Sequence, residues 1–186
     1  MEVKKEAGIL YNELSQLSQN HLFFWSQEIL FSWHWWISVA LSLLPWLLWW
    51  FFRPRESTMR LLTVGFFIML LSTVLDLVGL ACGFWYYPYQ VTPFFHGFLP
   101  WNNTLMPVTV MLLLLVPRFS LLSKAVTFGL LTSFVGEPLF IWMGLYVQLG
   151  WHHFYSLPIY TMLYILSHLI FHATSFKRPA PCLRKQ

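Results

Sequence analysis

Long runs of apolar residues separated by short loops constrain this sequence more than any other feature. The runs cover about residues 33–50, 61–84, 101–116, 125–147 and 156–175. A helix needs roughly 20 apolar residues to cross a bilayer, and in hydrocarbon a helix pairs all of its own backbone polar groups. The sequence therefore predicts an all-α protein, a polytopic transmembrane helix bundle of about five spans.

The charged residues are too few for the surface of a soluble domain. They make up 10% of the chain, hydrophobic residues make up 58%, and the mean hydropathy is +0.60, whereas soluble domains carry about 25% charged residues. The net charge of +4 comes from short basic clusters beside the apolar runs. This distribution is typical of membrane orientation signals, so the expected partner is the lipid bilayer and no nucleic acid is expected.

Three segments follow from this pattern: an amphipathic interfacial segment at 1–21, the helix bundle at 22–176 and a basic cytoplasmic tail at 177–186. The first segment should form a helix over 3–19 with one apolar face. That face comprises Ile9, Leu10, Leu14 and Leu17. Such a helix either lies on the membrane surface as an anchor or packs on its own bundle as a lead-in helix, and the modest apolar face favours the second.

The loops predict the orientation. Loops 53–60 and 118–124 and the tail are basic, whereas loops 85–103 and 150–156 contain no Lys or Arg. By the positive-inside rule, the N-terminus lies outside and the C-terminus lies in the cytoplasm. The loop at 85–103 is unusually apolar for a loop, so we expect it to fold back over the bundle as a cap.

Tryptophans and a capping serine mark the expected ends of two spans. Ser156 is an expected N-cap of the last span. Tryptophan favours the membrane–water interface, and the expected belts at the ends of the first span comprise Trp33, Trp35, Trp36, Trp46, Trp49 and Trp50.

Asp76, Glu137 and His168 are ionisable residues inside three different apolar runs. Counted from the expected outer ends, they lie roughly 12, 16–18 and 15 Å deep at 1.5 Å per residue. The sequence thus predicts one polar layer near the middle of the bilayer. Intramembrane ionisable residues are costly and generally functional, which favours a site for ligand binding or proton relay. The alternative is that these side chains join helices by hydrogen bonds.

Pro138 directly follows Glu137, and a proline inside a helix frees the carbonyl four residues before it, here that of Phe134. Ser133 lies on the same helical face as Glu137. A free carbonyl, a hydroxyl and a carboxylate could form a binding notch. The alternative is a kink whose free groups are satisfied by neighbouring helices.

The histidines indicate metal binding only weakly. His168 and His172 have the i, i+4 spacing of a ligand pair, but no HExxH pattern accompanies them. No metal and no other cofactor is therefore expected. His152 and His153 lie in an outer turn and are expected at the interface rather than as ligands.

Aromatic and amide side chains gather on the uncharged outer segments. They comprise Trp85, Tyr87, Trp101, Asn102, Tyr146, Trp151 and Tyr155. Each aromatic residue alone could belong to an interfacial belt. Together they could form an outer rim above the carboxylates, which would suit a lipid-like, isoprenoid or cationic ligand.

The order of these residues resembles an uncharacterised family of small polytopic membrane proteins of spore-forming Gram-positive bacteria. The motifs are Asp76-x-x-Gly79, Trp85-x-Tyr87-Pro88, Pro100-Trp101, Phe134-x-x-Glu137-Pro138, Tyr146, Trp151-x-x-x-Tyr155-Ser156 and Ile159-Tyr160. The resemblance covers about residues 60–160 and implies a bacterial plasma-membrane protein, but no activity. A fainter resemblance is to lycopene-cyclase-type membrane domains with a Pro-Glu-Glu motif, whereas here Glu137-Pro138 has no second Glu.

Two functional hypotheses remain open. The favoured one is a non-enzymatic membrane protein that binds or moves a small or lipid-like ligand, or is a subunit of an envelope complex with a membrane-protein partner. The alternative is an intramembrane enzyme acting on a lipid or isoprenoid, with Glu137 as acid/base and Asp76 as its partner. Against the enzyme, no phosphate-binding loop and no nucleophile in a recognisable setting is present.

Overall fold

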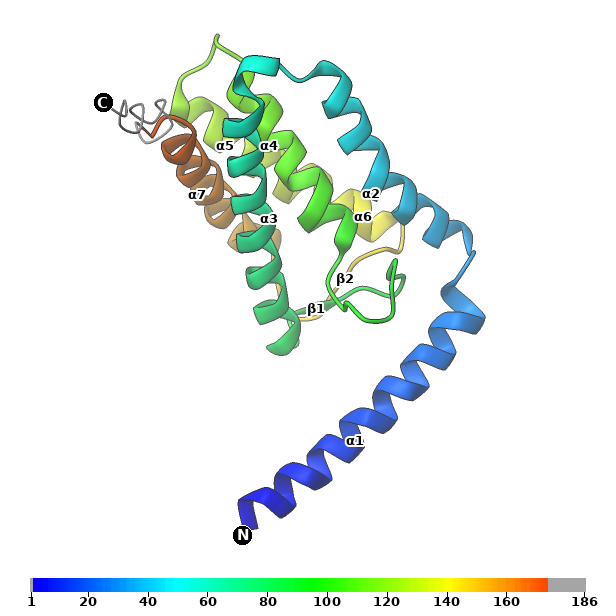
Figure 1. The fold of residues 1–186 in the computed structure, drawn as a ribbon. Coiled ribbons are helices and arrows are strands. Elements are labelled where there is room, and N and C mark those ends of the chain that lie inside the picture. Colours follow the sequence, from blue (N-terminus) through cyan, green and yellow to red (C-terminus); the bar gives the residue numbers. More distant parts are fainter. Residues whose placement is uncertain (1, 174–186) are drawn as a thin grey trace, which may run out of the picture.

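The computed structural model describes residues 2–173, and most of these lie in helices (Figure 1). The α-helices are α1 (Glu2–Phe24), α2 (Trp33–Phe52), α3 (Thr58–Ala81), α4 (Met106–Leu115), α5 (Leu121–Leu131), α6 (Glu137–Trp142) and α7 (His153–Phe171). Short π-helical turns occupy Trp25–Ile29, Trp101–Leu105 and Thr132–Gly136, and a 3₁₀ turn occupies Arg55–Ser57. The predicted all-α bundle is confirmed.

Four helical segments of the described chain are long and apolar enough to cross a membrane. They are Trp33–Phe52, Arg55–Ala81, Leu121–Trp142 and His153–Phe171. The remaining predicted span is the shorter apolar helix Trp101–Leu115, roughly 22 Å long at 1.5 Å per residue. It packs against α3 and contacts α7 within the bundle. Two spans were predicted to end too far along the chain, at about 84 and 147. The helices end earlier, α3 at Ala81 and α6 at Trp142.

The core lies between α3, α4, α5 and α7. It is filled by large apolar side chains that are fully buried, among them Leu61, Ile68, Met111, Phe128 and Tyr164. Trp49, predicted for an interfacial belt, is buried in the same core and only 2% exposed, so its ring packs within the bundle. A polytopic bundle buries such side chains because close packing adds dispersion contacts even where lipid surrounds the helices.

A glycine with positive φ follows each of the helices that carry a carboxylate. Gly83 (φ 70°) follows α3, and Gly144 (φ 73°) follows α6. This conformation costs a residue with a Cβ but not glycine, and it reverses the chain after the helix. The two returning chains then pair as the short antiparallel strands β1 (Trp85–Tyr86) and β2 (Val147–Gln148). We call this end of the bundle the aromatic end.

The segment between β1 and the turn at Trp101 covers the aromatic end, as predicted. Within it, Phe98 is 2% exposed and packs in a second apolar cluster. Two indoles hold it from outside, since Trp25 Nε1 donates to the Gln90 carbonyl (2.9 Å) and Trp35 Nε1 donates to the Val91 carbonyl (3.0 Å). These hydrogen bonds give the two tryptophans a structural role beyond any interfacial belt.

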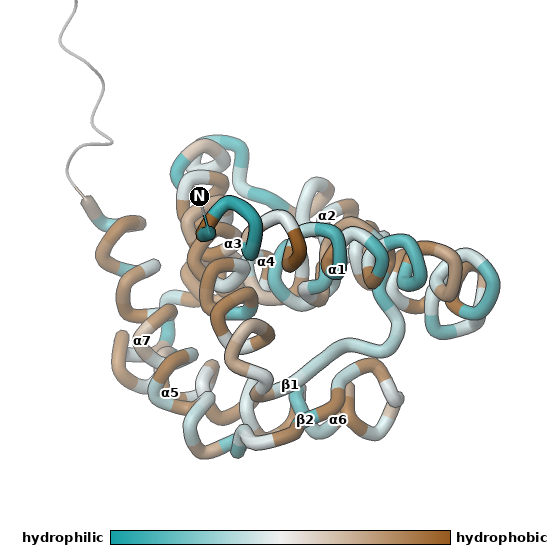
Figure 2. The backbone as a smooth tube through the Cα atoms, turned by 90° about the horizontal axis from the view of Figure 1, so that it is seen from below, coloured by the Kyte–Doolittle hydropathy of each residue, from teal (hydrophilic) through white to brown (hydrophobic). Residues whose placement is uncertain are grey.

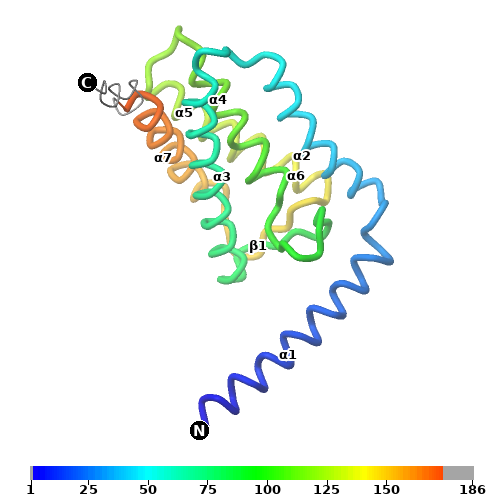
Figure 3. The backbone as a smooth tube through the Cα atoms, viewed as in Figure 1, coloured from blue at the N-terminus to red at the C-terminus, as the bar shows by residue number. Residues whose placement is uncertain are grey.

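Helix α1 extends away from the bundle (Figures 1 and 3). None of its residues is buried, and its predicted apolar face is exposed. The favoured expectation, a lead-in helix packed on its own bundle, is therefore wrong. Figure 2 shows hydrophilic residues along much of α1 and hydrophobic residues along the bundle helices. The predicted basic tail at 177–186 lies outside the described residues.

Candidate functional site

A cavity of about 180 Å³ opens at the aromatic end, between the two helices that carry the carboxylates. Both Asp76 and Glu137 line it, although each is only 5% exposed. The rest of the wall is mostly aromatic and apolar. Its other residues include Ser72, Gly79, Phe84, Trp85, Tyr87, Phe98, Trp101, Asn102, Phe140, Tyr146, Trp151, Ser156, Ile159, Tyr160 and Leu163.

Asp76 accepts four hydrogen bonds from residues 85–102. Trp85 Nε1 (2.9 Å) and the Tyr87 hydroxyl (2.6 Å) donate to Oδ1. Asn102 Nδ2 (2.6 Å) and the backbone N–H of Phe98 (3.3 Å) donate to Oδ2. An ionised carboxylate offers about four acceptor positions, so Asp76 is saturated. It acts as the anchor that holds residues 85–102 over the bundle.

The hydroxyl of Tyr87 remains a donor over a wide pH range. Burial raises the pKa of Tyr87 well above its usual value, and the nearby charge of Asp76 raises it further. A neutral hydroxyl can donate to a carboxylate, whereas a phenolate cannot. Tyr87 also stacks between the rings of Phe98 and Tyr146, which fixes the direction of its hydroxyl.

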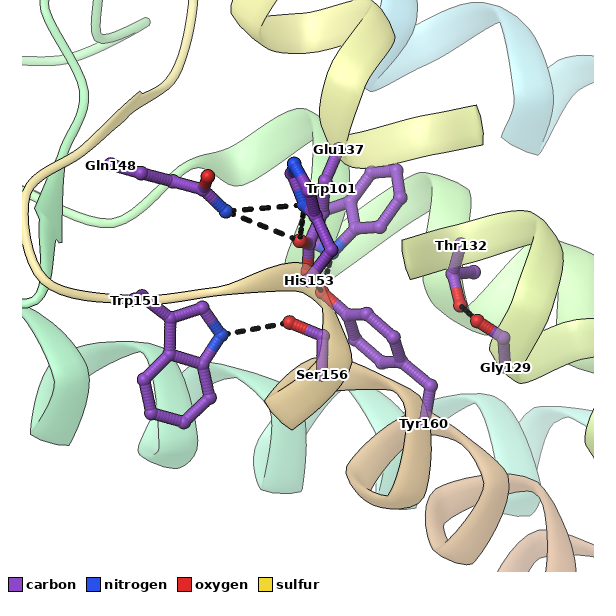
Figure 4. Close-up of polar contacts among 9 residues, drawn as sticks. All are labelled: Trp101, Gly129, Thr132, Glu137, Gln148, Trp151, His153, Ser156 and Tyr160. Carbon is purple, nitrogen blue, oxygen red and sulfur yellow. Dashed lines mark hydrogen bonds and ion pairs between the residues drawn. The ribbon is translucent and has the colours of Figure 1, made fainter. Parts of the chain in front are cut away.

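Glu137 has a different set of partners (Figure 4). The Tyr160 hydroxyl donates to Oε1 (3.0 Å), and His153 Nδ1 lies 2.7 Å from Oε2. With its proton on Nδ1, His153 donates to this oxygen, and Gln148 Nε2 donates to the same oxygen at 3.4 Å. The Tyr160 hydroxyl in turn accepts from Trp101 Nε1 (3.2 Å). Gln148 Nε2 also lies 3.2 Å from His153 Nδ1. Among the described residues, Tyr160 and Gln148 thus donate to Glu137, and His153 adds a third hydrogen bond when its Nδ1 carries the proton.

Trp101 and Asn102 connect the two carboxylate centres. They are adjacent in the π-helical turn Trp101–Leu105, yet Asn102 donates directly to Asp76 while Trp101 reaches Glu137 through Tyr160. Neighbouring residues of a helical turn point in different directions. One short turn therefore determines the position of both sides of the cavity.

Each π-helical turn at the cavity precedes a proline. In the turn Trp101–Leu105, the N–H of Met106 donates a hydrogen bond to the Trp101 carbonyl, and Pro107 follows directly. In the turn Thr132–Gly136, the N–H of Glu137 donates a hydrogen bond to the Thr132 carbonyl, and Pro138 follows directly. Prolines cannot donate the next helical hydrogen bond, and single π turns inside helices are frequent at functional sites.

The Asn103 carbonyl lies four residues before Pro107, which has no N–H to donate to it. It accepts a hydrogen bond from Trp46 Nε1 of α2 (2.9 Å). This contact satisfies the free group from a neighbouring helix, which is the way such groups are tolerated in membrane helices. It also ties α2 to the turn that carries Trp101 and Asn102.

Three glycines let the site close tightly. A Cβ on Gly79 would lie 2.0 Å from the Trp85 ring, and one on Gly136 would lie 2.5 Å from the Trp101 ring. A Cβ on Gly97 would lie 2.7 Å from Asp76 Oδ2. Real Cβ atoms essentially never approach so closely, so a larger residue at any of these positions would displace a wall of the cavity.

The structure brings most of the predicted site residues together. Asp76, Glu137 and six of the seven rim residues line the same cavity. The six are Trp85, Tyr87, Trp101, Asn102, Tyr146 and Trp151. The expected depth is wrong, since both carboxylates lie five residues before the ends of their helices, about 8 Å at 1.5 Å per residue. The reason is that Gly83 and Gly144 end these helices earlier than the apolar runs end.

His168 does not belong to the predicted layer. It lies three residues before the end of α7 that faces away from the cavity, with its ring 4.3 Å from that of His172. The residues described by the structure contain no group of three or more His, Cys, Asp or Glu that could hold a metal ion. The layer is therefore formed by Asp76 and Glu137 without the histidine.

Ser133 and Tyr155 also lie outside the cavity wall. The Ser133 hydroxyl is fully buried and has no hydrogen-bond partner among the described residues, and Tyr155 is exposed, with its ring against Trp151. Ser156 is not the N-cap of α7, because the helix begins at His153. It lies in the first turn of α7 and accepts from Trp151 Nε1 (2.8 Å).

Sequence reasoning missed His153 and Gln148, and it did not assign Tyr160 to the site. His153 was expected at the interface, but it contacts Glu137 directly. The signal was present in the spacing of His153, Ser156 and Tyr160, which at i, i+3 and i+7 form one face of a helix. Gln148 had no such signal, because the pairing of β2 with β1 determines its position.

Comparison of the chain with protein-family models, curated proteins and solved structures finds no match.

Proposed function

We propose that this is an integral protein of the bacterial plasma membrane that binds a small or lipid-like ligand in the cavity at the aromatic end. The observation that carries the proposal is the cavity of about 180 Å³, lined by two buried carboxylates and a wall of aromatic rings. An apolar cavity of about 150 Å³ can hold benzene, so this space suits a single ring or a short branched segment. By the positive-inside rule, the loops without Lys or Arg support an outer location for this end.

Binding fits the packing better than transport does. Beyond the cavity the core is filled by Leu61, Met111, Phe128 and Tyr164, each at most 1% exposed. Protein interiors of this kind are close-packed, and a path to the opposite end would require these side chains to move. The cavity therefore supports a receptor, carrier subunit or storage site for a ligand that enters from the aromatic end or from the adjacent lipid.

The test is to purify the protein in a mild detergent and to identify bound small molecules by native mass spectrometry. We expect a ligand on the wild type, lost or strongly reduced in Glu137→Gln. Glu28→Gln is the matched control, because Glu28 is exposed and lies outside the cavity wall. Full ligand occupancy in Glu137→Gln, at wild-type thermal stability, would show that the ligand binds elsewhere.

An intramembrane enzyme acting on a lipid or isoprenoid is the second candidate. The observation in its favour is the 2.7 Å contact between His153 Nδ1 and Glu137 Oε2, since a carboxylate that orients an imidazole is a common acid–base arrangement. Asp76 is a poor acid–base partner because its acceptor positions are all occupied. The same purification decides between the candidates: an enzyme converts the ligand, and a binding protein returns it unchanged.

A further inference from the structure

The charged residues of the cavity are all acidic. Among the described residues that line it, Asp76 and Glu137 carry the charges, and none is Lys or Arg. The basic residues of the bundle lie at the other end, in the loops or first helical turns there. They are Arg53, Arg55, Arg60, Arg118 and Lys124. The nearest titratable base is His153, and even as an imidazolium it would offset only one of the two carboxylates.

Neutral groups donate all four hydrogen bonds to Asp76 and two of those to Glu137. Those of Asp76 come from an indole, a phenol, an amide and a backbone N–H. Such donors stabilise a negative charge without cancelling it. The rings of Trp85, Trp101 and Trp151 line the cavity, and the faces of aromatic rings attract cations. The field inside the cavity therefore favours a cation and opposes an anion.

The two carboxylates differ in their capacity for a ligand. Asp76 accepts four hydrogen bonds and has no acceptor position left. With the proton of His153 on Nδ1, Glu137 accepts three from described residues, so one acceptor position of an ionised carboxylate remains. A ligand N–H can therefore be received by Glu137, while Asp76 holds the wall of the cavity in place.

We propose that the cavity binds an organic ammonium ion with an apolar body, whose N–H donates to Glu137 and whose body lies among the aromatic rings. This inference rests on the proposed function and specifies the ligand class. A charge-assisted hydrogen bond is stronger than a neutral one, so the N–H distinguishes this class from neutral ring compounds. A quaternary ammonium ion has the positive charge that the cavity favours, but it has no N–H to donate to the free acceptor position of Glu137.

The test compares four probes that share a phenyl body: 2-phenylethylamine, trimethyl(2-phenylethyl)ammonium, 2-phenylethanol and 3-phenylpropionate. Their binding to the wild-type protein in nonionic detergent at neutral pH is measured by titration calorimetry. We expect the primary amine to bind about 10-fold or more tightly than the alcohol, the quaternary ion to fall between them, and the carboxylate to bind least. In Glu137→Gln, the amine should bind no better than the alcohol, while Glu28→Gln should keep the wild-type order.

The outcomes distinguish the ammonium class of the ligand from ligand binding in the cavity itself. If the alcohol and the carboxylate bind as tightly as the amine, the cavity binds ligands but the ammonium class is wrong. If none of the four binds, the ammonium inference is overturned, while the proposed function is still decided by the ligand that co-purifies with the wild type. If the amine keeps its advantage in Glu137→Gln, the role given to Glu137 is wrong. The comparison among probes uses the wild type alone, so it remains decisive even if the variant fails to fold.

Discussion

Gly79 lies directly against the indole of Trp85: a Cβ on Gly79 would be 2.0 Å from Cζ2 of that ring. Trp85 in turn donates to Asp76, which lies one helical turn before Gly79 on α3. The glycine therefore permits the approach that closes the hydrogen bond between the covering segment and the carboxylate. This explains physically why the motif Asp76-x-x-Gly79 and Trp85 occur together.

Gly79→Ala should displace Trp85 and weaken its hydrogen bond to Asp76. Overpacking of this kind costs about 1–3 kcal/mol of folding free energy, so the midpoint of thermal unfolding in detergent should fall. Gly150→Ala is the matched control, since nothing lies within 4 Å of its added Cβ. Equal midpoints for the two variants would contradict the close packing of Gly79 on Trp85.

Asp76→Asn should destabilise the protein more than Glu137→Gln. The amide nitrogen of an asparagine would face two of the four donors that now converge on Asp76. Hydrogen bonds to charged groups contribute about 1.5–3 kcal/mol each, so we expect a loss of roughly 3 kcal/mol or more. Thermal unfolding monitored by tryptophan fluorescence measures both variants. The reverse order would mean that Asp76 is not the main anchor of residues 85–102.

Trp46→Phe should leave the Asn103 carbonyl without its donor. An unsatisfied buried acceptor costs about 1–3 kcal/mol, while Trp142→Phe, at a position 83% exposed, should have little effect. Pro107→Ala restores an N–H four residues after Asn103. We therefore expect the loss in Trp46→Phe to be smaller when Pro107→Ala is present. A strictly additive double-mutant cycle would argue against the link between the proline and the indole.

Stability should fall in alkaline solution because of Tyr87. Burial and the charge of Asp76 raise the pKa of Tyr87 in the folded protein, whereas an unfolded tyrosine titrates near 10. A raised folded pKa contributes stability that is complete below about pH 10 and is lost as the pH rises from there through the folded pKa. One such tyrosine costs about 1.4 kcal/mol per pH unit in that window.

The measurement is the unfolding midpoint between pH 8 and pH 12. Tyr87→Phe should lower the midpoint at pH 8, where a hydrogen bond is lost, and should make the decline above pH 10 less steep. Some decline should remain, because burial also raises the pKa of Tyr146. Tyr11→Phe, at an exposed position on α1, should follow the wild-type profile. A wild-type decline that begins well below pH 10 would have to come from other groups.

Cysteine labelling tests the orientation. In a background without Cys82 and Cys182, single cysteines at positions 96 and 56 replace exposed residues at opposite ends of the bundle. If the aromatic end lies outside, a membrane-impermeant maleimide added to intact cells should label position 96 and not position 56. The opposite pattern would place Glu137 and its cavity on the cytoplasmic side.

The apolar runs were sufficient to predict the helices, because a membrane segment must pair its own backbone groups and a helix does so locally. Composition likewise excluded a soluble domain, and the rarity of intramembrane carboxylates pointed to Asp76 and Glu137. The apolar loop between 85 and 103 predicted a cap for a similar reason, since such a surface would otherwise face water.

Hydrophobicity could not locate the helix ends at the aromatic end, however. The apolar runs continue past Ala81 and Trp142, where chain reversals at Gly83 and Gly144 end α3 and α6. That shift explains the error in depth for both carboxylates. His168 lies far from both carboxylates for a different reason: α7 starts beside Glu137 and carries the histidine to the opposite end of the bundle.

The sequence by itself determined that this chain forms membrane helices and that two carboxylates and a set of aromatic residues belong to one region. Only the tertiary structure decided that Asp76 is saturated, that Glu137 keeps an acceptor position, and that His153 and Tyr160 are its partners. The physical reason is distance along the sequence. Hydropathy and helical periodicity depend on neighbouring residues, whereas the partners of a buried carboxylate come from segments that only the folded bundle brings together.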